Sequence, residues 1–216
     1  GDFVAILGYP GRTERYLPAP EAERQLEQFL PARVALYGEW IGILERMGAA
    51  DAAVRIKVAA KLKGLQNRHK NAMGMIDGIR RNGLLDRRKA EDEALAAWAA
   101  EQGPKQQEYA GVLAGLRELG EGRRATFERD FVVDNLGNGP NLLPLAIDLV
   151  RRARERAKPD LERRGPYQDR GAEKLWSRQE SRLKDYDAGV DQALMEALFG
   201  RAEALPAELR FTTLGV

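Results

Sequence analysis

The chain has 216 residues, of which 44% are hydrophobic and 31% are charged. This composition is too apolar for a disordered segment and is sufficient for one domain with a real core. Because 35 basic residues nearly balance 33 acidic ones, the formal charge is only +2, which gives little support for nucleic-acid binding. With no cysteine and one histidine, disulfides and the usual zinc sites are excluded, and we expect no metal and no cofactor.

Residues 1–16 differ in pattern from the rest of the chain. The run from Gly1 to Leu7 resembles a β-strand and leads into a loop of glycine and proline, whereas helical patterns follow. A lone strand leaves its backbone groups unpaired, at about 1–3 kcal/mol for each one buried. We therefore expect the strand to belong to a sheet outside the chain. Because there is also no initiator Met, we expect the chain to be a piece of a larger protein.

Helices are expected in succession after this loop. Pro20, followed by acidic residues, predicts a helix start. Apolar residues at helical spacing continue this helix to Gly48, and Pro31 is expected to kink it or to divide off a short first helix. The next helix should begin at Asp51, a good N-cap, and end at a left-handed stop at Gly83.

Further helices are expected at about residues 86–102, 105–119, 123–133 and 142–158, separated by glycine and proline. We expect an exposed turn at residues 135–141 and a broken stretch at 160–171. The last helix is expected to run unbroken from residue 172 to 204, with Trp176, Leu183 and Val190 seven residues apart as a packing seam. The predicted fold class is mainly α, an antiparallel helical bundle with long paired helices and one short N-terminal strand. No stretch is long and apolar enough to span a membrane, and no secretory leader is present.

The helix after Asp51 carries two different faces. Its apolar stripe includes His69, the single histidine, for which we expect a packing role. On another side Asn67 and Asn71, one turn apart, form a polar ribbon with Lys70 and Gly74. Asn is a mediocre helix former, so each amide costs a few tenths of a kcal/mol relative to Ala. The two amides either bond neighbouring backbone or another helix, or they offer their oxygens to a ligand ammonium or amide.

Other candidate chemistry is weak within this chain. Ser177 and Ser181 are the only serines and lie in a charged helix, and no nucleophile motif surrounds them, so nucleophilic catalysis is not expected here. Glycines in residues 8–13 precede no Walker-type Lys and Ser/Thr, which excludes a phosphate loop. The cations between Arg151 and Arg164 could face a polyanion, but acidic residues dilute them and favour a solvated face.

Three sets of residues resemble a known family, the bacterial serine dipeptidyl peptidases of the dipeptidyl-peptidase 7 and dipeptidyl aminopeptidase type. The first set is Gly1-Asp2-Phe3-Val4 with residues 8–13 and Arg15-Tyr16. The second is Asn67-Arg68-His69-Lys70-Asn71 with Gly74-Met75. The third comprises Arg182-Leu183, Tyr186-Asp187, Val190-Asp191 and Leu205-Pro206. Together the three sets extend over nearly the whole chain.

The resemblance implies a helical domain inserted in a chymotrypsin-like double β-barrel. Residues 1–16 would be a strand and loop of the adjoining barrel, 17–205 the helical cap and 206–216 the return to the barrel. The catalytic triad would lie outside this chain, so the fragment alone would be inactive. An Asn of the cap would help to bind the substrate's free α-ammonium, and this role falls to Asn67, with Asn71 as second choice.

The resemblance also implies the partners, oligomeric state and location of the parent protein. Its partners would be peptides with a free N-terminus and the barrels of the same chain, in a homodimer located in the periplasm or secreted, without nucleic-acid or membrane partners. The alternative that the residues leave open is a non-enzymatic helical interaction module that binds a polyanion such as nucleic acid through the Arg151 to Arg164 cluster.

Overall fold

The computed structural model describes residues 17–101 and 103–211, and most of this part of the chain is helical. The helices are α1 (Ala19–Arg24), α2 (Leu30–Ala50), α3 (Ala52–Arg81), α4 (Leu84–Ala99), α5 (Pro104–Ala125), α6 (Phe127–Asn135), α7 (Leu142–Glu155), α8 (Ala172–Lys184) and α9 (Ala188–Glu203). A π-helical turn, η1 (Gln25–Phe29), joins α1 to α2, and short 3-10 turns occupy Asp160–Glu162, Gly165–Tyr167, Asp169–Gly171 and Ala207–Leu209. The mainly α class is confirmed, whereas the predicted strand lies in residues 1–16, outside the described ranges.

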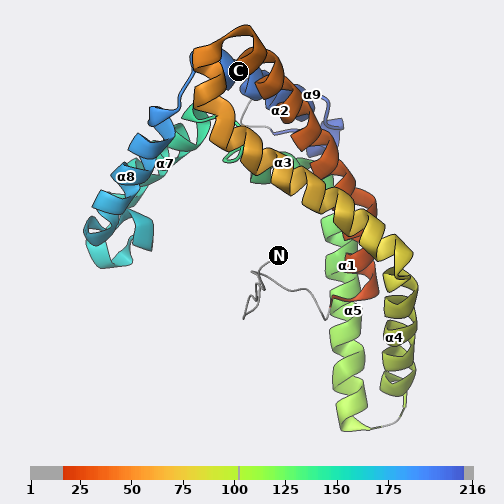
Figure 1. Ribbon diagram of the computed structural model, residues 1–216. Coiled ribbons are helices and arrows are strands. Elements are labelled where there is room, and N and C mark those ends of the chain that lie inside the picture. Colours follow the sequence, from red (N-terminus) through yellow and green to blue (C-terminus); the bar gives the residue numbers. More distant parts are fainter. Residues whose placement is uncertain (1–16, 102, 212–216) are drawn as a thin grey trace, which may run out of the picture.

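The helices form an arch (Figure 1). The long paired helices that the sequence predicts are α2 and α3, which pack antiparallel along one limb. This limb continues into the α4–α5 hairpin, against which α1 packs, while α7 and α8 form a second limb, the α7–α8 arm (residues 142–184). The expected bundle is therefore an open arrangement of locally paired helices.

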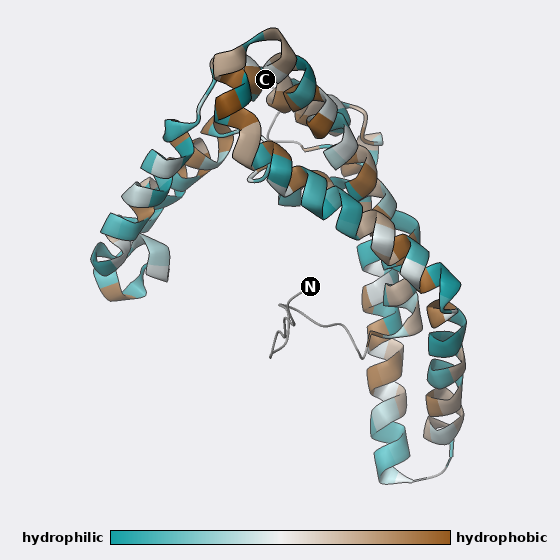
Figure 2. Ribbon diagram, in the orientation of Figure 1, coloured by the Kyte–Doolittle hydropathy of each residue, from teal (hydrophilic) through white to brown (hydrophobic). Residues whose placement is uncertain are grey.

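The core lies where α2, α3, α6 and α9 meet. Figure 2 shows hydrophobic residues gathered near the apex of the arch, while much of α3 is hydrophilic. Apolar residues on α2 recur at helical spacing, and Trp40 and Leu44 are fully buried there. The other core residues are Leu36, Tyr37, Ile43, Val58, Leu65, Phe127, Phe131, Val132, Val190, Leu194, Leu198 and Ala202. The core thus joins segments that lie more than 150 residues apart in the sequence.

Pro31 does mark a short first helix, as predicted. It occupies the first turn of α2, where its missing N–H does little harm. The turn before it is π-helical, and the Leu30 N–H donates to the Gln25 carbonyl, five residues back. A proline ring crowds the preceding turn of an α-helix, and the wider π turn gives it room.

The predicted cap and stop of α3 are confirmed. The Asp51 carboxylate accepts hydrogen bonds from the Ala53 and Val54 N–H groups at 2.7 and 3.4 Å. At the other end Gly83 has φ of 55°, the left-handed conformation that glycine adopts without strain. Local chemistry therefore fixes both ends of the longest helix.

The prediction of a single long helix at residues 172–204 is wrong. The chain breaks at residues 185–187, and Asp187 caps α9 by accepting the Val190 N–H at 3.2 Å. The proposed seam is divided as a result. Trp176 and Leu183 are 40% and 43% exposed on α8, whereas Val190 is buried on α9. The break turns α9 onto α2 and leaves α8 in the arm.

The fourth helix also differs from prediction. α5 runs through Gly120 and Gly122 and ends at Ala125, because its last turns pack against α1. A Cβ on Gly120 would lie 3.8 Å from Pro20 Cβ, an ordinary van der Waals distance, so the two helices pack directly against each other here. Arg124, beyond the predicted end, forms ion pairs with Glu23 and Glu27.

The turn expected at residues 135–141 is confirmed, but only its tip, Gly137 and Asn138, is exposed. Asn135, Gly139 and Pro140 are buried, and Gly139 lies against the Trp40 indole. Buried backbone needs polar partners. Lys61 on α3 provides one, since its Nζ donates to the Gly139 carbonyl at 2.6 Å and to Asn141 Oδ1 at 2.7 Å. The segment thus forms the predicted turn, and tertiary contacts bury its two ends.

Replacing Gly139 with Ala should destabilise the fold. A Cβ at this position would lie 2.6 Å from Trp40 Cζ2, and overpacking of this kind costs about 1–3 kcal/mol. Urea unfolding followed by far-ultraviolet circular dichroism measures the free energy of unfolding. Gly137→Ala is the matched control, because a Cβ there meets no atom within 4 Å, and we expect a change below about 0.5 kcal/mol. Equal effects of the two substitutions would contradict the packing of Gly139 on Trp40.

Candidate functional site

The polar ribbon of α3 is an exposed surface. Asn67, Lys70, Asn71 and Gly74 are all exposed. Neither amide side chain has a hydrogen-bond partner among the described residues, so the alternative in which both amides bond another helix does not hold within that part of the chain. Their oxygens and N–H₂ groups are therefore free to bind a ligand.

The opposite face of α3 packs on the core. Val58, Leu65 and Ala72, each seven residues apart, are at most 4% exposed. His69 is partly buried beside α2, with its Nε2 3.5 Å from the position that a Cβ on Gly38 would occupy. The packing role predicted for His69 agrees with this position.

A hollow of about 880 Å³ lies beside the ribbon. It is lined by residues from α1, the π turn, the start of α2, the C-terminal half of α3, the end of α5 and α6. Its lining residues are Leu17, Glu21, Arg24, Gln25, Phe29, Arg33, Asn71, Met75, Arg123, Phe127, Asp130, Phe131 and Asp134. Asn71 therefore belongs to the hollow, whereas Asn67 lies one turn away on the same exposed face and does not line it.

Three of the six charged residues that line the hollow are paired with each other, and Asp130 pairs with Arg129 beside it. Glu21 accepts from Arg24 Nε at 2.8 Å and lies 3.7 Å from Arg123. Burial raises the pKa of Glu21, but its hydrogen bonds and the charges of Arg24 and Arg123 outweigh burial, so the pKa lies below its usual value. A hydrogen bond from Thr126 and the neighbouring Arg129 likewise hold the pKa of Asp130 low. Both carboxyls are therefore ionised at neutral pH.

Two charged groups of the hollow have no ionic partner among the described residues. Asp134 is an exposed carboxylate without an ion pair. The Arg33 guanidinium lies over the rings of Phe29 and Tyr37, with its Cζ 5.7 and 5.3 Å from the ring centroids, and its Nε is buried without a hydrogen-bond partner. Sequence reasoning missed Arg33, although its spacing of four residues from each aromatic residue placed all three on one helix face.

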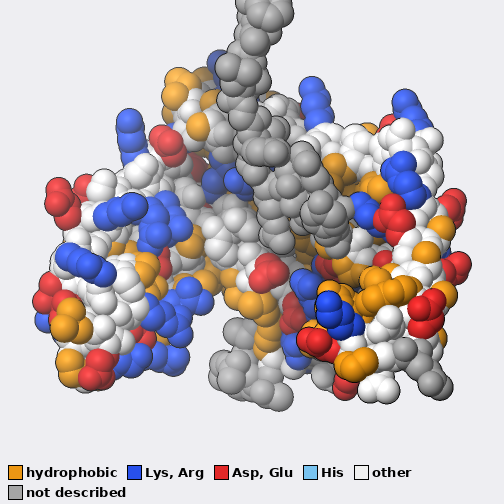
Figure 3. All heavy atoms as spheres, turned by 90° about the horizontal axis from the view of Figure 1, so that it is seen from below, with side chains coloured by type: hydrophobic (Ala, Val, Ile, Leu, Met, Phe, Trp, Pro, Cys, Tyr) orange, Lys and Arg blue, Asp and Glu red, His pale blue; other side chains and the backbone are white. Residues whose placement is uncertain are grey.

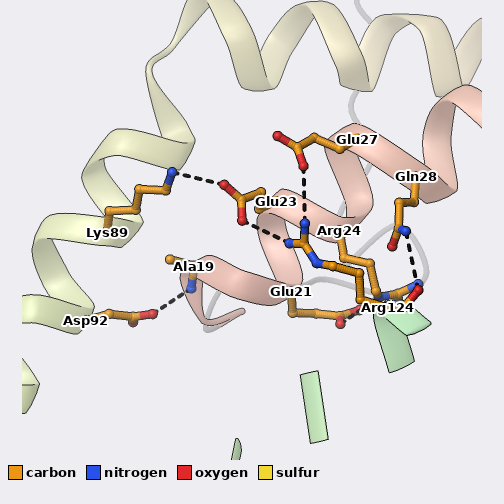
Figure 4. A network of polar contacts seen from close by, with 9 residues as sticks. All are labelled: Ala19, Glu21, Glu23, Arg24, Glu27, Gln28, Lys89, Asp92 and Arg124. Carbon is orange, nitrogen blue, oxygen red and sulfur yellow. Dashed lines mark hydrogen bonds and ion pairs between the residues drawn. The ribbon is translucent and has the colours of Figure 1, made fainter. Parts of the chain in front are cut away.

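Polar contacts from α4 and α5 fix α1 in place as a wall of the hollow (Figure 4). Glu23 accepts from Lys89 at 3.0 Å and from Arg124 at 2.9 Å. The first helical N–H, that of Ala19, donates to Asp92 at 2.7 Å. The hydrogen bonds from Lys89 and Arg124 hold the pKa of Glu23 low. This network bridges three helices and sets the position of Glu21 and Arg24 relative to Asn71.

The remaining candidates do not gather into a catalytic arrangement. Ser177 and Ser181 lie exposed on α8, whereas His69 lies on α3 against α2. Part of the Arg151 to Arg164 cluster has partners: Arg152 lies 5.2 Å from the ring of Trp176, Arg163 pairs with Asp160 and Asp169, and Arg164 lies near Glu155. Arg151, Arg154 and Arg156 are exposed and have no ion pair among the described residues, so the cluster is only partly neutralised. The described residues contain no group of His, Cys, Asp and Glu suited to a metal ion.

The described residues thus form a helical module in which two unpartnered amides lie next to a polar hollow. Among these residues no catalytic arrangement of side chains is assembled. The profile of the family Peptidase S46 matches residues 1–213, and the chain belongs to that family. The resemblance expected from the sequence is therefore confirmed. No described helix is both long and apolar enough to cross a membrane.

Several relatives are dipeptidyl-peptidases. An Asp/Glu-specific dipeptidyl-peptidase of Shewanella putrefaciens is 28% identical over 196 residues, which cover 91% of this chain and 26% of the relative. A dipeptidyl-peptidase 7 of Porphyromonas gingivalis is 33% identical over 67% of this chain and 20% of its own length. Another, of Capnocytophaga gingivalis, is 35% identical over 53% of this chain and 16% of its own length. The chain thus spans at most about a quarter of the curated relatives it matches.

Substituting Glu21 should reveal a contribution to stability that disappears in acid. Because its pKa in the folded chain is below the ordinary value of about 4.3, ionised Glu21 stabilises the fold above that pH, and the contribution is lost as pH falls through the lowered value. We expect Glu21→Gln to lose about 1 kcal/mol at pH 7, and we expect its difference from wild type to shrink steadily as pH falls below about 4.3. Urea unfolding at several pH values measures this difference. Glu118→Gln, at an exposed position on α5 without an ion pair among the described residues, should change little throughout. A deficit of Glu21→Gln that is as large in acid as at pH 7 would contradict the ionic role.

Proposed function

We propose that the chain is the helical cap of a serine-type dipeptidyl aminopeptidase that releases dipeptides from the free N-terminus of peptides. Membership of the Peptidase S46 family and relatives that are dipeptidyl-peptidases support the peptidase class. The described residues bring no serine and histidine together. The triad then belongs to the remainder of the protein, and the chain alone is inactive.

The observation that carries the proposal is the pair of free amides on α3. Asn67 is our first choice for binding the substrate α-ammonium, and Asn71 is the second. Both are exposed and have no hydrogen-bond partner among the described residues, although each is unfavourable in a helix. Asn71 shares its hollow with Asp134, a carboxylate without an ion pair in the described residues. Amide and carboxylate oxygens are suitable acceptors for an ammonium group.

Binding the N-terminus would define the length of the product. An enzyme that releases dipeptides must hold the ammonium at a fixed distance from its nucleophile. Acceptors placed on a rigid helix such as α3 can set that distance and disfavour a blocked N-terminus. Charge-assisted hydrogen bonds contribute about 1.5–3 kcal/mol each, and correct orientation of the peptide adds to catalysis.

The cap also requires partners from the same protein. Chymotrypsin-like barrels would hold the nucleophile and close the cleft from the other side, and movement of the cap could open it. We further propose a periplasmic or secreted location and a homodimeric parent. No cofactor is required for this chemistry, since the ammonium is held by side-chain oxygens alone.

The test is cleavage of a dipeptidyl reporter substrate by the full-length protein. Asn67→Ala should lower kcat/KM by about 10- to 100-fold on the free substrate, as expected for loss of a charge-assisted hydrogen bond, and Asn71→Ala should lower it less. Wild type should reject the N-acetylated reporter. Gln107→Ala is the matched control, because it removes an exposed amide from α5 that has no partner among the described residues, and its kcat/KM should stay within about twofold of wild type.

Each result separates one part of the proposal from the rest. Absence of dipeptide release by wild type overturns the peptidase function. Activity that is unaffected by either Asn substitution overturns the ammonium site. Activity lost only in Asn71→Ala assigns the role to the residue that lines the hollow. Equal activity on free and acetylated substrate contradicts N-terminal recognition.

A further inference from the structure

A second hollow lies on the α7–α8 arm, away from the ribbon of α3. Its volume is about 840 Å³, and it follows one face of α8. The lining residues are Gly165, Pro166, Gly171, Lys174, Leu175, Ser177, Arg178, Ser181 and Arg182. We call it the arm groove. None of these residues contributes to the proposed ammonium site.

One wall of the groove is rigidly built. The turn at residues 165–166 approaches the start of α8 so closely that a Cβ on Gly171 would lie 2.7 Å from the Gly165 carbonyl oxygen. Hydrogen bonds hold the preceding segment: Asp160 accepts the Asp169 N–H at 2.8 Å, and Arg163 donates to both carboxylates. The groove is therefore formed before any ligand binds, which reduces the entropic cost of binding.

The groove is positively charged, and so is the arm around it. Residues 142–184 contain twelve Lys and Arg against seven Asp and Glu, a net charge of +5, whereas the whole chain carries +2. Figure 3 shows Lys and Arg gathered over this limb of the arch. The acidic residues Glu173 and Glu180 on α8 do not line the groove. An anionic ligand is therefore favoured here.

The charge of the groove is moderate rather than extreme. Arg178 and Arg182 share one carboxylate, Asp148 on α7, at 3.1 and 3.2 Å. Hydrogen bonds from Gln179 and Tyr167 to Asp148 outweigh its burial and keep its pKa low, so it stays ionised. Lys174 is exposed and has no ion pair among the described residues. Three cations and one anion leave a charge of +2, which suits a short ligand with two or three carboxylates better than a polyanion.

The cations and hydroxyls are spaced for an extended peptide. Lys174, Arg178 and Arg182 recur every four residues, which is about 6 Å along the helix axis. Alternate side chains of an extended peptide are about 6.6 Å apart. Ser177 and Ser181 lie between the cations as hydrogen-bond donors, and the exposed Pro166, on the wall formed by residues 165–166, offers apolar surface for the intervening side chains, which point away from α8. A phosphodiester backbone would gain nothing from that apolar wall.

From this match of charge, spacing and apolar wall, we infer that the arm groove binds an extended acidic peptide segment in which acidic and apolar residues alternate. Its carboxylates pair with Lys174 and the two arginines, and its apolar side chains face the wall that carries Pro166. The inference is independent of the proposed function, because it uses another helix and needs no cleavage.

Fluorescence anisotropy with the full-length protein tests this inference. The probe is a labelled, N-acetylated peptide amide of sequence Glu-Leu-Glu-Leu-Glu, with a second peptide in which Gln replaces Glu as its neutral counterpart. We expect binding of the acidic peptide, weakening at high salt, and at least about fivefold weaker binding of the neutral one. Lys174→Glu should weaken binding of the acidic peptide by about fivefold or more. Ser177→Tyr should also weaken its binding, because the larger side chain fills the groove.

Lys184→Glu is the matched control, because it reverses a charge on the same helix at an exposed position outside the groove, and its Kd should stay within about twofold. Circular dichroism spectra that match wild type show that the variants are folded. Equal binding of the two peptides, or equal effects of the substitutions at positions 174 and 184, overturns the inference. Tighter binding of a single-stranded oligonucleotide than of the acidic peptide also overturns it, in favour of a polyanion site.

Discussion

The arch depends on one buried carboxylate, that of Asp191. It is 2% exposed in the first turn of α9, and it accepts the backbone N–H groups of Asn141 and Leu142 where α7 begins. These groups have no partner within their own helix, and a negative charge at this end is favourable. Lys61 on α3 donates to the Gly139 carbonyl, just before these groups. Burial lowers the pKa of Lys61, while the negative charge of Asp191 opposes that shift. Three helices distant in sequence thus meet at one polar joint, which fixes the direction of the arm.

α3 connects this joint to the candidate site. One face of the helix packs in the core through Val58, Leu65 and Ala72. The other face, which carries Asn67 and Asn71, therefore remains exposed. The polar network around Glu23 and Arg124 places α1 next to that face and completes the hollow (Figure 4). The two hollows therefore share a scaffold but not their residues. One belongs to the ribbon limb and the other to the arm, so a protein built on this scaffold can contact separate parts of a ligand or two different ligands.

Features that depend on nearby residues could be predicted from the sequence. Periodicity revealed α2 and α3, and cap chemistry at Asp51 and Gly83 gave the ends of α3 correctly. The predictions failed where contacts between residues distant in the sequence determine the local structure. Residues 185–187, where α8 and α9 separate, contain no glycine or proline, and the packing of α9 on α2 favours the Asp187 cap over a continuous helix. The hollow could not be foreseen, because its carboxylates at positions 21 and 134 come from helices far from Asn71 in the sequence.

The π turn between α1 and α2 has a consequence for the phase of the helix. It holds one residue more per turn than regular α-helix, and a single residue corresponds to about 100° around the axis. The side chains of α1, before the turn, are therefore rotated about the helix axis by roughly a quarter of a revolution relative to their positions in a continuous α-helix. Deleting one residue between Gln25 and Phe29 would restore the regular winding and swing Glu21 and Arg24 away from Arg33 without changing any of these side chains. The chemical character of the hollow is thus encoded in chain length at this turn as much as in residue identity.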